Sequence, residues 1–353
     1  GGSSWQMITR NYFREKMPDK EIVIVNAGIG GTTSEYGAKR FQRDVLAFNP
    51  DLVVIEFAVN DRSFGTSKGE TRHQYSMESM IYQCTQAEKV PAVMFLYSNY
   101  PYASDSTDAQ NIQYSIKAKE ALAKFYNIPT VNAYEYCYDL YEDDKEKTST
   151  SYTQWLEEEK RYYPKNNVHP YDNGYELFGE AIVEQFEKNG LDHYLKPVSL
   201  KSGFFCSSDR SKVVSRYNYL YMNDTSKFTY NGKWYLCNKE NPRNELDASV
   251  PTKFYEYPYY PTGIVYTSTM DSSISFKCNA PEFHVSYITG LTGNDIVVLV
   301  DGREVSTIST SSTYDNMNYV SSAVTGVGGK VVTLKARYNT PLRICAIIER
   351  YNK

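Results

Sequence analysis

Pro50-Asp-Leu-Val-Val-Ile-Glu-Phe-Ala-Val-Asn60-Asp61 is the stretch that decides how the chain folds. Residues 51–57 form a short, almost continuous apolar run, which is typical of a parallel strand buried on both faces of a sheet. A carboxamide, that of Asn60, lies three residues after the end of this run. Loops at the carboxyl edge of an α/β sheet are where ligands bind. Asn60 is therefore a candidate site residue that could donate to an oxyanion, and its alternative role is that of a turn-forming residue.

Strand and helix patterns alternate on both sides of this stretch. Similar apolar runs occupy residues 21–26, 91–96 and 128–131. Stretches with apolar residues near helical spacing lie at residues 33–48, 72–87, 108–126 and 174–188. This alternation predicts an α/β domain with a parallel sheet, right-handed crossovers and site loops at the carboxyl ends of the strands. We expect it to span residues 1–196.

After Pro197 the pattern changes to that of β-strands, and no helical periodicity of useful length follows residue 200. Alternating or apolar segments predict strands at residues 273–278, 283–287, 297–305, 330–336 and 343–348. Asp301-Gly302 is a typical hairpin turn within this series. We therefore predict a second, all-β domain, a jelly-roll-like sandwich over residues 203–353, with the boundary near residues 195 to 203.

Composition excludes several classes of function. Lys plus Arg number 38 and Asp plus Glu 42, giving a net charge of −4, which argues against a nucleic-acid or anionic-membrane partner. No apolar run reaches the roughly 18 residues that would indicate a transmembrane helix. The six cysteines contain no C-x-x-C motif, and whether any of them form a disulfide stays open. The four histidines are not paired at metal-ligand spacing, so a zinc catalyst is not expected.

Two further loops carry candidate site residues. Ala27-Gly-Ile-Gly-Gly-Thr-Thr33 leads from a predicted strand into a helix, so bare backbone N–H groups would meet a helix N-terminus and could hold an anion. Thr33 breaks the G-x-G-x-x-G pattern, and the alternative is a tight turn that needs glycine for steric reasons. Asn166-Asn-Val-His-Pro170 precedes another predicted helix, and His169 there could act as a general base.

Together these stretches resemble the sequence blocks of the GDSL/SGNH hydrolases, esterases with a flavodoxin-like α/β/α fold. Asn26-Ala-Gly-Ile-Gly-Gly31 resembles the second block, and the stretch quoted first resembles the third, with Ala58 where the family usually has Gly. Val168-His169-Pro170 resembles the fifth block. The resemblance implies that His169 is the base, and that the Gly31 N–H and the Asn60 side chain hold the oxyanion.

The nucleophile is the first departure from the family pattern. It is normally a Ser in a Gly-Asp-Ser or Gly-Gly-Ser block that follows a strand. Gly1-Gly-Ser-Ser4 matches three letters of that block, yet no strand precedes it and only one residue separates Ser3 from Trp5. Either the first block precedes residue 1, or Ser3 is what remains of it, or these residues are a linker. We favour a missing or truncated block over Ser3 as the working nucleophile. Without a nucleophile the chain cannot form an acyl-enzyme.

Asn166 is the second departure, because the family usually has Asp three residues before the base. A carboxylate there fixes the histidine tautomer, and an Asn can select the wrong one at a cost of about 10⁴ in rate. Some members of the family work as a Ser-His dyad with a backbone carbonyl in that role. Whether Asn166 supports His169 therefore stays open.

The β domain resembles the jelly-roll modules fused to carbohydrate esterases of this class, over roughly residues 274–349. Aromatic residues could stack on sugar rings or fill the sandwich core, namely Trp234, Tyr235, Tyr255, Tyr257, Tyr259 and Tyr260. The domain could also form one wall of the active-site cleft.

We predict a secreted or cell-surface bacterial serine ester hydrolase that removes acetyl groups from plant polysaccharide or oligosaccharide, with no metal, cofactor, nucleic-acid partner or membrane partner. The 34 tyrosines supply amphipathic faces suited to sugars as well as to packing. Two alternatives are a lipid or thioester hydrolase on the same fold, and a catalytically inactive SGNH domain retained as a glycan-binding module.

Overall fold

The apolar run at residues 51–57 forms strand β1 (Leu52–Ile55), at one edge of a parallel sheet. It pairs with β2 (Ala92–Tyr97), which pairs with β3 (Thr130–Asn132). Every residue of β2 is buried, as expected for a strand covered on both faces. The computed structural model describes residues 4–64, 69–102, 106–148, 150–165, 167–200, 203–206, 212–214, 216–222, 224–237, 264–313 and 318–351.

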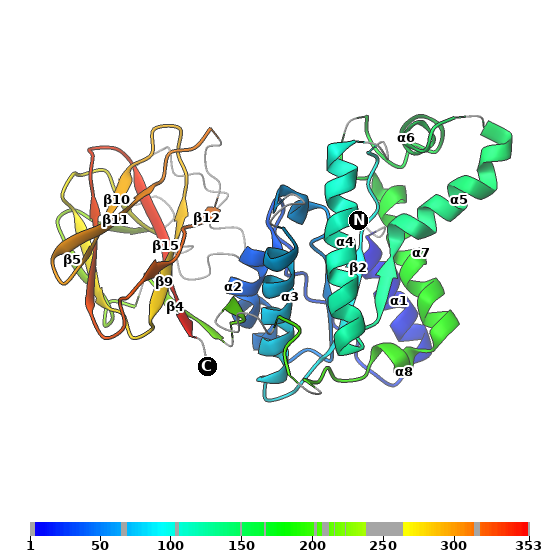
Figure 1. The fold of residues 1–353 in the computed structure, drawn as a ribbon, viewed down its shortest axis with the longest axis horizontal. Coiled ribbons are helices and arrows are strands. Elements are labelled where there is room, and N and C mark those ends of the chain that lie inside the picture. Colours follow the sequence, from blue (N-terminus) through cyan, green and yellow to red (C-terminus); the bar gives the residue numbers. More distant parts are fainter. Residues whose placement is uncertain are drawn as a thin grey trace. The chain divides into compact units, whose positions relative to one another are not determined.

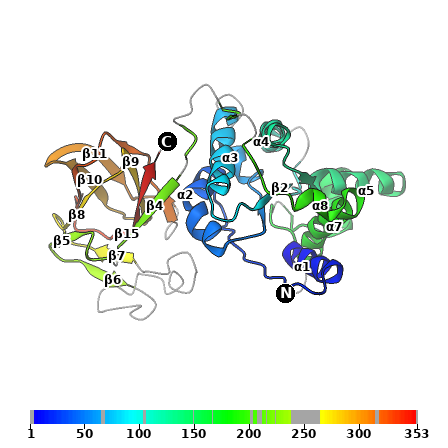
Figure 2. The same cartoon turned by 90° about the horizontal axis from the view of Figure 1, so that it is seen from below.

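Helices cover both faces of this sheet. The helical elements are α1 (Trp5–Lys16), α2 (Ser34–Asp44), η1 (Leu46–Phe48), η2 (Asn60–Phe64), α3 (Gly69–Thr85), α4 (Thr107–Tyr126), α5 (Ala133–Thr148), α6 (Tyr152–Gln154), η3 (Trp155–Glu159), α7 (Asp172–Asn189) and α8 (Leu191–Tyr194). Met94 and Leu96 of β2 share a core with Phe13 of α1 and Ile182 of α7. Figure 2 shows α3 and α4 on the opposite side of β2 from α7 and α8. The predicted α/β/α class is confirmed.

The strand predicted at residues 21–26 is wrong. These residues have no regular secondary structure, and Val23 and Val25 are 70% and 48% exposed. A strand requires a neighbour that satisfies its backbone hydrogen bonds. Among the strands that the structure describes, β1 pairs with β2 alone, and none runs beside residues 21–26. The apolar pattern of this segment therefore remains, but the pairing that would bury it is missing.

The chain forms two compact units, residues 1–215 and 216–353 (Figure 1). The first includes a segment beyond α8 that contacts α3. The Glu78 carboxylate accepts hydrogen bonds from the backbone N–H groups of Phe205 and Cys206, and Val214 N–H donates to Ser79 Oγ over 2.9 Å. The boundary predicted near residues 195 to 203 stays a prediction.

The second unit consists of two antiparallel sheets. Their strands are β4 (Arg216–Tyr221), β5 (Thr229–Asn231), β6 (Tyr235–Cys237), β7 (Ile264–Thr267), β8 (Ser273–Lys277), β9 (Glu282–Ile288), β10 (Asp295–Val300), β11 (Arg303–Ser309), β12 (Asn318–Val320), β13 (Val324–Thr325), β14 (Val331–Ala336) and β15 (Leu342–Tyr351). One sheet has the order β11-β10-β14-β8-β5, and the other contains β12-β9-β15-β7-β6. Buried residues of both, such as Ile274 and Ile347, form one core. The predicted β-sandwich is confirmed.

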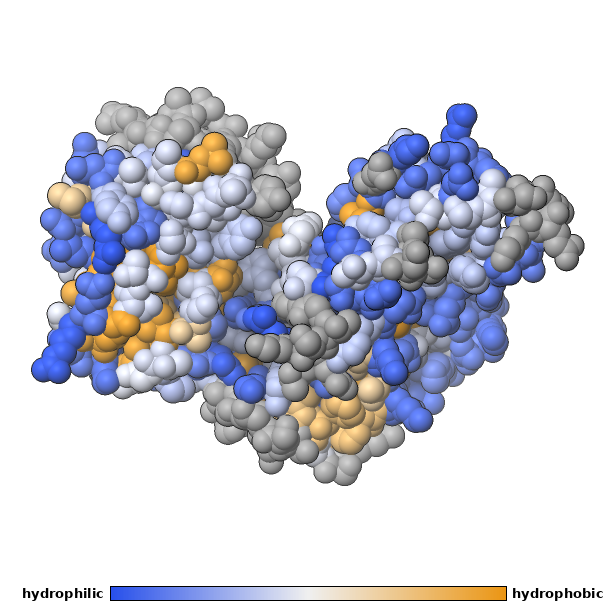
Figure 3. All heavy atoms as spheres, turned by 45° about the horizontal axis from the view of Figure 1, so that its top comes forward, coloured by the Kyte–Doolittle hydropathy of each residue, from blue (hydrophilic) through white to orange (hydrophobic). Residues whose placement is uncertain are grey.

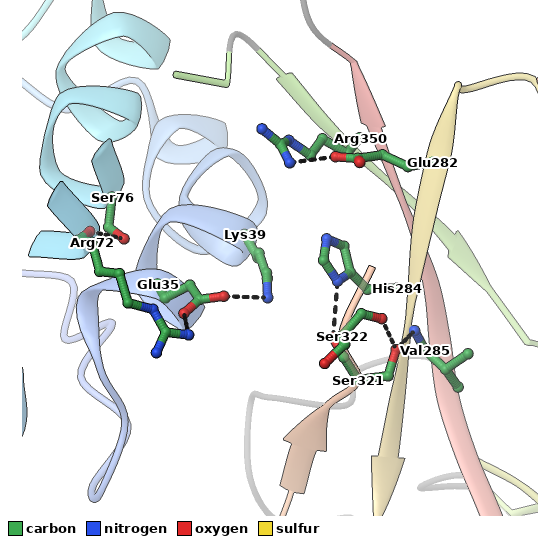
Figure 4. A network of polar contacts seen from close by, with 10 residues as sticks. All are labelled: Glu35, Lys39, Arg72, Ser76, Glu282, His284, Val285, Ser321, Ser322 and Arg350. Carbon is green, nitrogen blue, oxygen red and sulfur yellow. Dashed lines mark hydrogen bonds and ion pairs between the residues drawn. The ribbon is translucent and has the colours of Figure 1, made fainter. Parts of the chain in front are cut away.

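Polar contacts also order the edge of the second unit. His284 of β9 lies with its Nδ1 2.9 Å from the Ser321 carbonyl, and Val285 N–H donates to Ser321 Oγ over 2.9 Å (Figure 4). Arg350 forms an ion pair with Glu282. His284 is buried and its Nδ1 lies against a backbone carbonyl, so we do not count it as a candidate general base.

Hydrophilic side chains cover most of the helical unit in the view of Figure 3, and the described cysteines whose exposure is given are buried. None of the described helices is long and apolar enough to cross a membrane. Four cysteines of the described segments are free and buried, namely Cys84, Cys137, Cys206 and Cys278, and Cys345 is buried as well. The four free cysteines do not form the disulfide that the sequence left open.

Candidate active site

Asn60 lies where β1 leaves the sheet, as the first residue of η2. The turn before it is held by Glu56, whose Oε1 accepts hydrogen bonds from the Ala58 N–H and from Ser98 Oγ, each over 3.0 Å. Burial raises the pKa of the Glu56 carboxyl above its ordinary value, against the opposing effect of the Ser98 hydrogen bond. Since Ser98 follows β2, Glu56 joins the carboxyl ends of two neighbouring strands beside Asn60.

The glycine loop leads into α2, although the strand predicted before it does not form. Gly28 N–H donates to Asn26 Oδ1 over 2.9 Å, and Thr32 Oγ1 donates to the Ile29 carbonyl over 2.7 Å. The guanidinium of Arg40 donates to the Ala27 carbonyl. Gly31 has a φ of +71°, a backbone conformation that glycine adopts at no steric cost. The loop is thus fixed by its own side chains and by α2.

Asp61 joins this loop to the Asn60 turn. Its Oδ1 accepts the Ser34 N–H at the start of α2 over 2.8 Å. Its Oδ2 lies 2.8 Å from Lys119 Nζ of α4 and 3.3 Å from His73 Nδ1 of α3. Burial would raise the pKa of the Asp61 carboxyl, but the Lys119 charge and the hydrogen bonds from His73, Lys119 and Ser34 outweigh it and lower the pKa to about 2. Asp61 is therefore an ionised group with no exposure to solvent.

His73 is excluded as a catalytic base by the same arrangement. Its side chain is fully buried, and burial lowers its pKa although Asp61 opposes that shift. Sequence reasoning missed the Asp61 cluster. Asp61 stands next to Asn60 in the stretch that decided the fold, which was a usable signal, whereas nothing in the spacing of His73 and Lys119 indicates that they meet.

An ion pair also connects α2 to α3, and a second one lies within α2. Glu35 of α2 lies between two cations, with Lys39 Nζ at 3.4 Å and Arg72 Nη2 at 3.2 Å (Figure 4). The Glu35–Arg72 pair is exposed and contributes little to stability. It shows that the first turn of α2, which also meets Asp61, is connected to α3.

His169 lies exposed in the loop before α7, and its backbone N–H donates to Asn167 Oδ1 over 2.9 Å. This loop is fastened to the end of β2. The Tyr163 hydroxyl donates to the Asn99 carbonyl over 3.0 Å, and the Tyr171 N–H donates to the Tyr162 carbonyl over 2.8 Å. The general base predicted from sequence is thus held near the carboxyl edge of the sheet with its ring accessible to solvent.

The structure describes three of the five predicted site residues. The Gly31 loop and the Asn60 turn are joined through Ser34 and Asp61, and the His169 loop is fastened to the neighbouring strand. Whether Gly31, Asn60 and His169 converge on one reacting carbonyl stays a prediction. Ser3 and Asn166 lie outside the described residues, so their predicted roles also stay predictions.

The predicted sugar-stacking residues are only partly described. Trp234 packs against the core of the second unit, and its Nε1 donates to the Asn231 carbonyl over 3.1 Å, which favours the packing role. Tyr235 lies in β6, with Lys233 Nζ 5.4 Å from its ring centroid. Tyr255, Tyr257, Tyr259 and Tyr260 lie outside the described residues. Within the described segments, no three His, Cys, Asp or Glu side chains are grouped as metal ligands.

Residues 1–177 match the GDSL-like lipase/acylhydrolase family. This match covers the glycine loop, the Asn60 turn and the His169 loop. The chain belongs to the GDSL-like lipase/acylhydrolase family. Its members are carboxylic ester hydrolases of the SGNH type, and this agrees with the resemblance found in the sequence.

Solved structures extend the likeness to the β-sandwich of this GDSL-family chain. A two-domain esterase active on acetylated mannans, crystallised with mannopentaose, superposes with a TM-score of 0.69 at 17% identity, over 100% of this chain and 86% of that one. A second crystal structure of a two-domain esterase active on acetylated mannans gives 0.66 at 18% identity, over 99% and 86%. At these identities the likeness shows a shared two-domain fold.

One curated protein is similar over a shorter stretch. An uncharacterised lipoprotein of Bacillus subtilis (strain 168), YqeF, is 39% identical over 67 residues, which are 19% of this chain and 28% of that protein. The match thus spans little more than a quarter of the lipoprotein's length.

Proposed function

We propose that this chain is a serine esterase that removes acetyl groups from plant polysaccharides or oligosaccharides. The observation that carries the proposal is the hydrogen bond from Ser34 N–H to Asp61 Oδ1, because it brings together the two segments that would supply the oxyanion donors. The two-domain neighbours active on acetylated mannans support the acetylated glycan as substrate.

In the proposed reaction, a serine hydroxyl attacks the acetyl carbonyl while His169 takes its proton. The Gly31 N–H and the Asn60 side-chain amide donate hydrogen bonds to the oxyanion of the tetrahedral intermediate. Collapse of the intermediate breaks the ester bond, and the sugar hydroxyl leaves with the proton from His169. Water then hydrolyses the acetyl-enzyme by the same steps, which releases acetate and restores the serine.

The test of the oxyanion role compares Asn60→Ala with Asn11→Ala, an exposed helical position on α1. Loss of one oxyanion donor should lower kcat on an aryl acetate by about 10²- to 10³-fold, or roughly 2.7 to 4 kcal/mol, with little change in stability. The control should keep the wild-type rate. An unchanged kcat in Asn60→Ala would contradict the proposal.

The base and the nucleophile are tested in the same assay. His169→Ala should cost at least as much as Asn60→Ala, while His193→Ala, an exposed histidine of α8, should cost nothing. Loss of hydrolysis in Ser3→Ala assigns the nucleophile to Ser3, and retained hydrolysis excludes it. Acetate release from acetylated mannan or xylan then identifies the substrate.

Other results would favour the two alternatives. Faster turnover of long-chain lipid esters or acyl thioesters than of acetylated glycans would indicate a lipid or thioester hydrolase. Binding of acetylated glycans without turnover would indicate a glycan-binding module. The similarity to a lipoprotein supports a location outside the cell or on its surface, which fractionation of the native host would test.

A further inference from the structure

The Asp61 cluster is a buried group of charges, within the described part of the helical unit, that the proposed reaction does not use directly. Asp61 and His73 have no exposure to solvent and Lys119 is 1% exposed, so none of the three contacts a substrate. Burying a carboxylate and an ammonium carries a desolvation penalty, which their mutual attraction offsets only when the geometry is good. Apolar residues in the same place would carry no such penalty. A cluster of this kind calls for a role other than stability alone.

Three helices meet at this one carboxylate. α2 supplies the Ser34 N–H, α3 supplies His73 and α4 supplies Lys119. Lys119 Nζ also donates to Ser115 Oγ over 2.5 Å, so the cation itself is fixed from within α4. The carboxylate therefore has a single orientation, with Oδ1 toward α2 and Oδ2 toward the two basic groups.

We propose that Asp61, held in place by Lys119 and His73, is a positioning residue that sets the distance between the two oxyanion donors of this site. The inference rests on the proposed function. Asp61 follows Asn60 directly in the chain, and the N–H that it accepts lies three residues after Gly31. A shift of this bond would move Asn60 and Gly31 apart, and a misplacement of about 1 Å can lower a rate about 100-fold.

Two double variants separate positioning from charge balance. Asp61→Asn with Lys119→Met removes both charges but keeps an amide oxygen that can accept the Ser34 N–H. Asp61→Ala with Lys119→Met removes the same charges and also the acceptor. Removing both members of a buried ion pair avoids leaving one charge unpaired, which is itself strongly destabilising.

We expect the first double variant to keep most of kcat on an aryl acetate. The second should lose about 100-fold in kcat with a much smaller change in KM, because the donors act mainly on the oxyanion of the transition state. Glu78→Gln is the control for a merely structural loss, since Glu78 is a buried carboxylate of α3 that contacts residues 205 and 206. It should lower the free energy of unfolding and leave kcat unchanged.

Equal kcat values in the two folded double variants would overturn the inference. If the alanine double variant does not fold, Asp61→Leu with Lys119→Met, which also lacks an acceptor for the Ser34 N–H, takes its place, and a kcat equal to that of the asparagine double variant would overturn the inference as well. NMR gives a reading that does not depend on activity. The Ser34 amide should exchange slowly in the wild type and in the asparagine double variant, and quickly in the alanine double variant, with shifts of the Gly31 and Asn60 amide resonances.

The same measurements distinguish failure of the proposed function from failure of this inference. If the protein shows no ester hydrolysis even with any residues that precede residue 1 included, the proposed function is contradicted, while exchange of the Ser34 amide still reports on the positioning bond. The inference is contradicted if, in the alanine double variant, the Ser34 amide exchanges as in the wild type and the Gly31 and Asn60 resonances do not shift. This outcome holds whatever the activity.

Discussion

At the scale of single residues, the lowered pKa of Asp61 makes the free energy of unfolding depend on pH in the acidic range. The carboxyl has a pKa of about 2 in the fold against an ordinary value of 3.8, so the unfolded chain binds more protons between these values. The stabilisation that the Asp61 carboxylate contributes is complete when the pH is above the ordinary pKa, and it is lost as the pH falls through about 2. In denaturant titrations, the free energy of unfolding of the wild type should fall more steeply from pH 5 to 2 than that of Asp61→Asn with Lys119→Met. Parallel curves would contradict the assignment.

Asn166 offers a second prediction at this scale. If the tautomer of His169 limits the rate, Asn166→Asp should raise kcat on an aryl acetate, since a carboxylate fixes the tautomer and stabilises the imidazolium. The matched control is Asn167→Asp, which places the new charge one residue away. A gain in both variants, or in neither, would mean that the carboxylate does not act through His169.

At the scale of elements, close packing at the start of α7 should hold the backbone of the His169 loop in position. A Cβ on Gly174 would lie 2.5 Å from the Tyr162 carbonyl oxygen and 2.6 Å from Pro170 Cβ. The backbone must move to admit it, so Gly174→Ala should cost roughly 1–3 kcal/mol in the free energy of unfolding and should also lower kcat.

Gly328, in the second unit, has room for a Cβ and serves as the comparison for Gly174. A Cβ on Gly328 would make only ordinary contacts, at 3.5 Å or more, so Gly328→Ala should change the free energy of unfolding little. Equal effects of the two substitutions in denaturant unfolding would show that the contact with Tyr162 is not what matters at Gly174.

At the scale of the whole molecule, each unit has its own core, so we expect two unfolding transitions. Ile347 is fully buried in the core of the β-sandwich, and Ile182 is fully buried between α7 and the sheet. Ile347→Ala should destabilise one transition and Ile182→Ala the other, each by about 2–5 kcal/mol. Calorimetry checks this, and a single transition shifted by both substitutions would mean that the units unfold together.

By itself the sequence determined the two-domain α/β and β-sandwich architecture, because periods of two and of 3.6 residues and apolar runs are local properties of the chain. It also placed Asn60 in a turn after β1 and His169 in the loop before α7. Both positions follow from a strand or helix boundary that a few neighbouring residues define.

Only the tertiary structure decided the rest. Residues 21–26 have the composition of a strand, yet Val23 is exposed because a strand exists only where a partner accepts its hydrogen bonds. Asp61, His73 and Lys119 are separated by 12 and 46 residues and meet because α3 and α4 pack side by side next to η2. Burial and distance between such residues depend on packing, which no local pattern specifies.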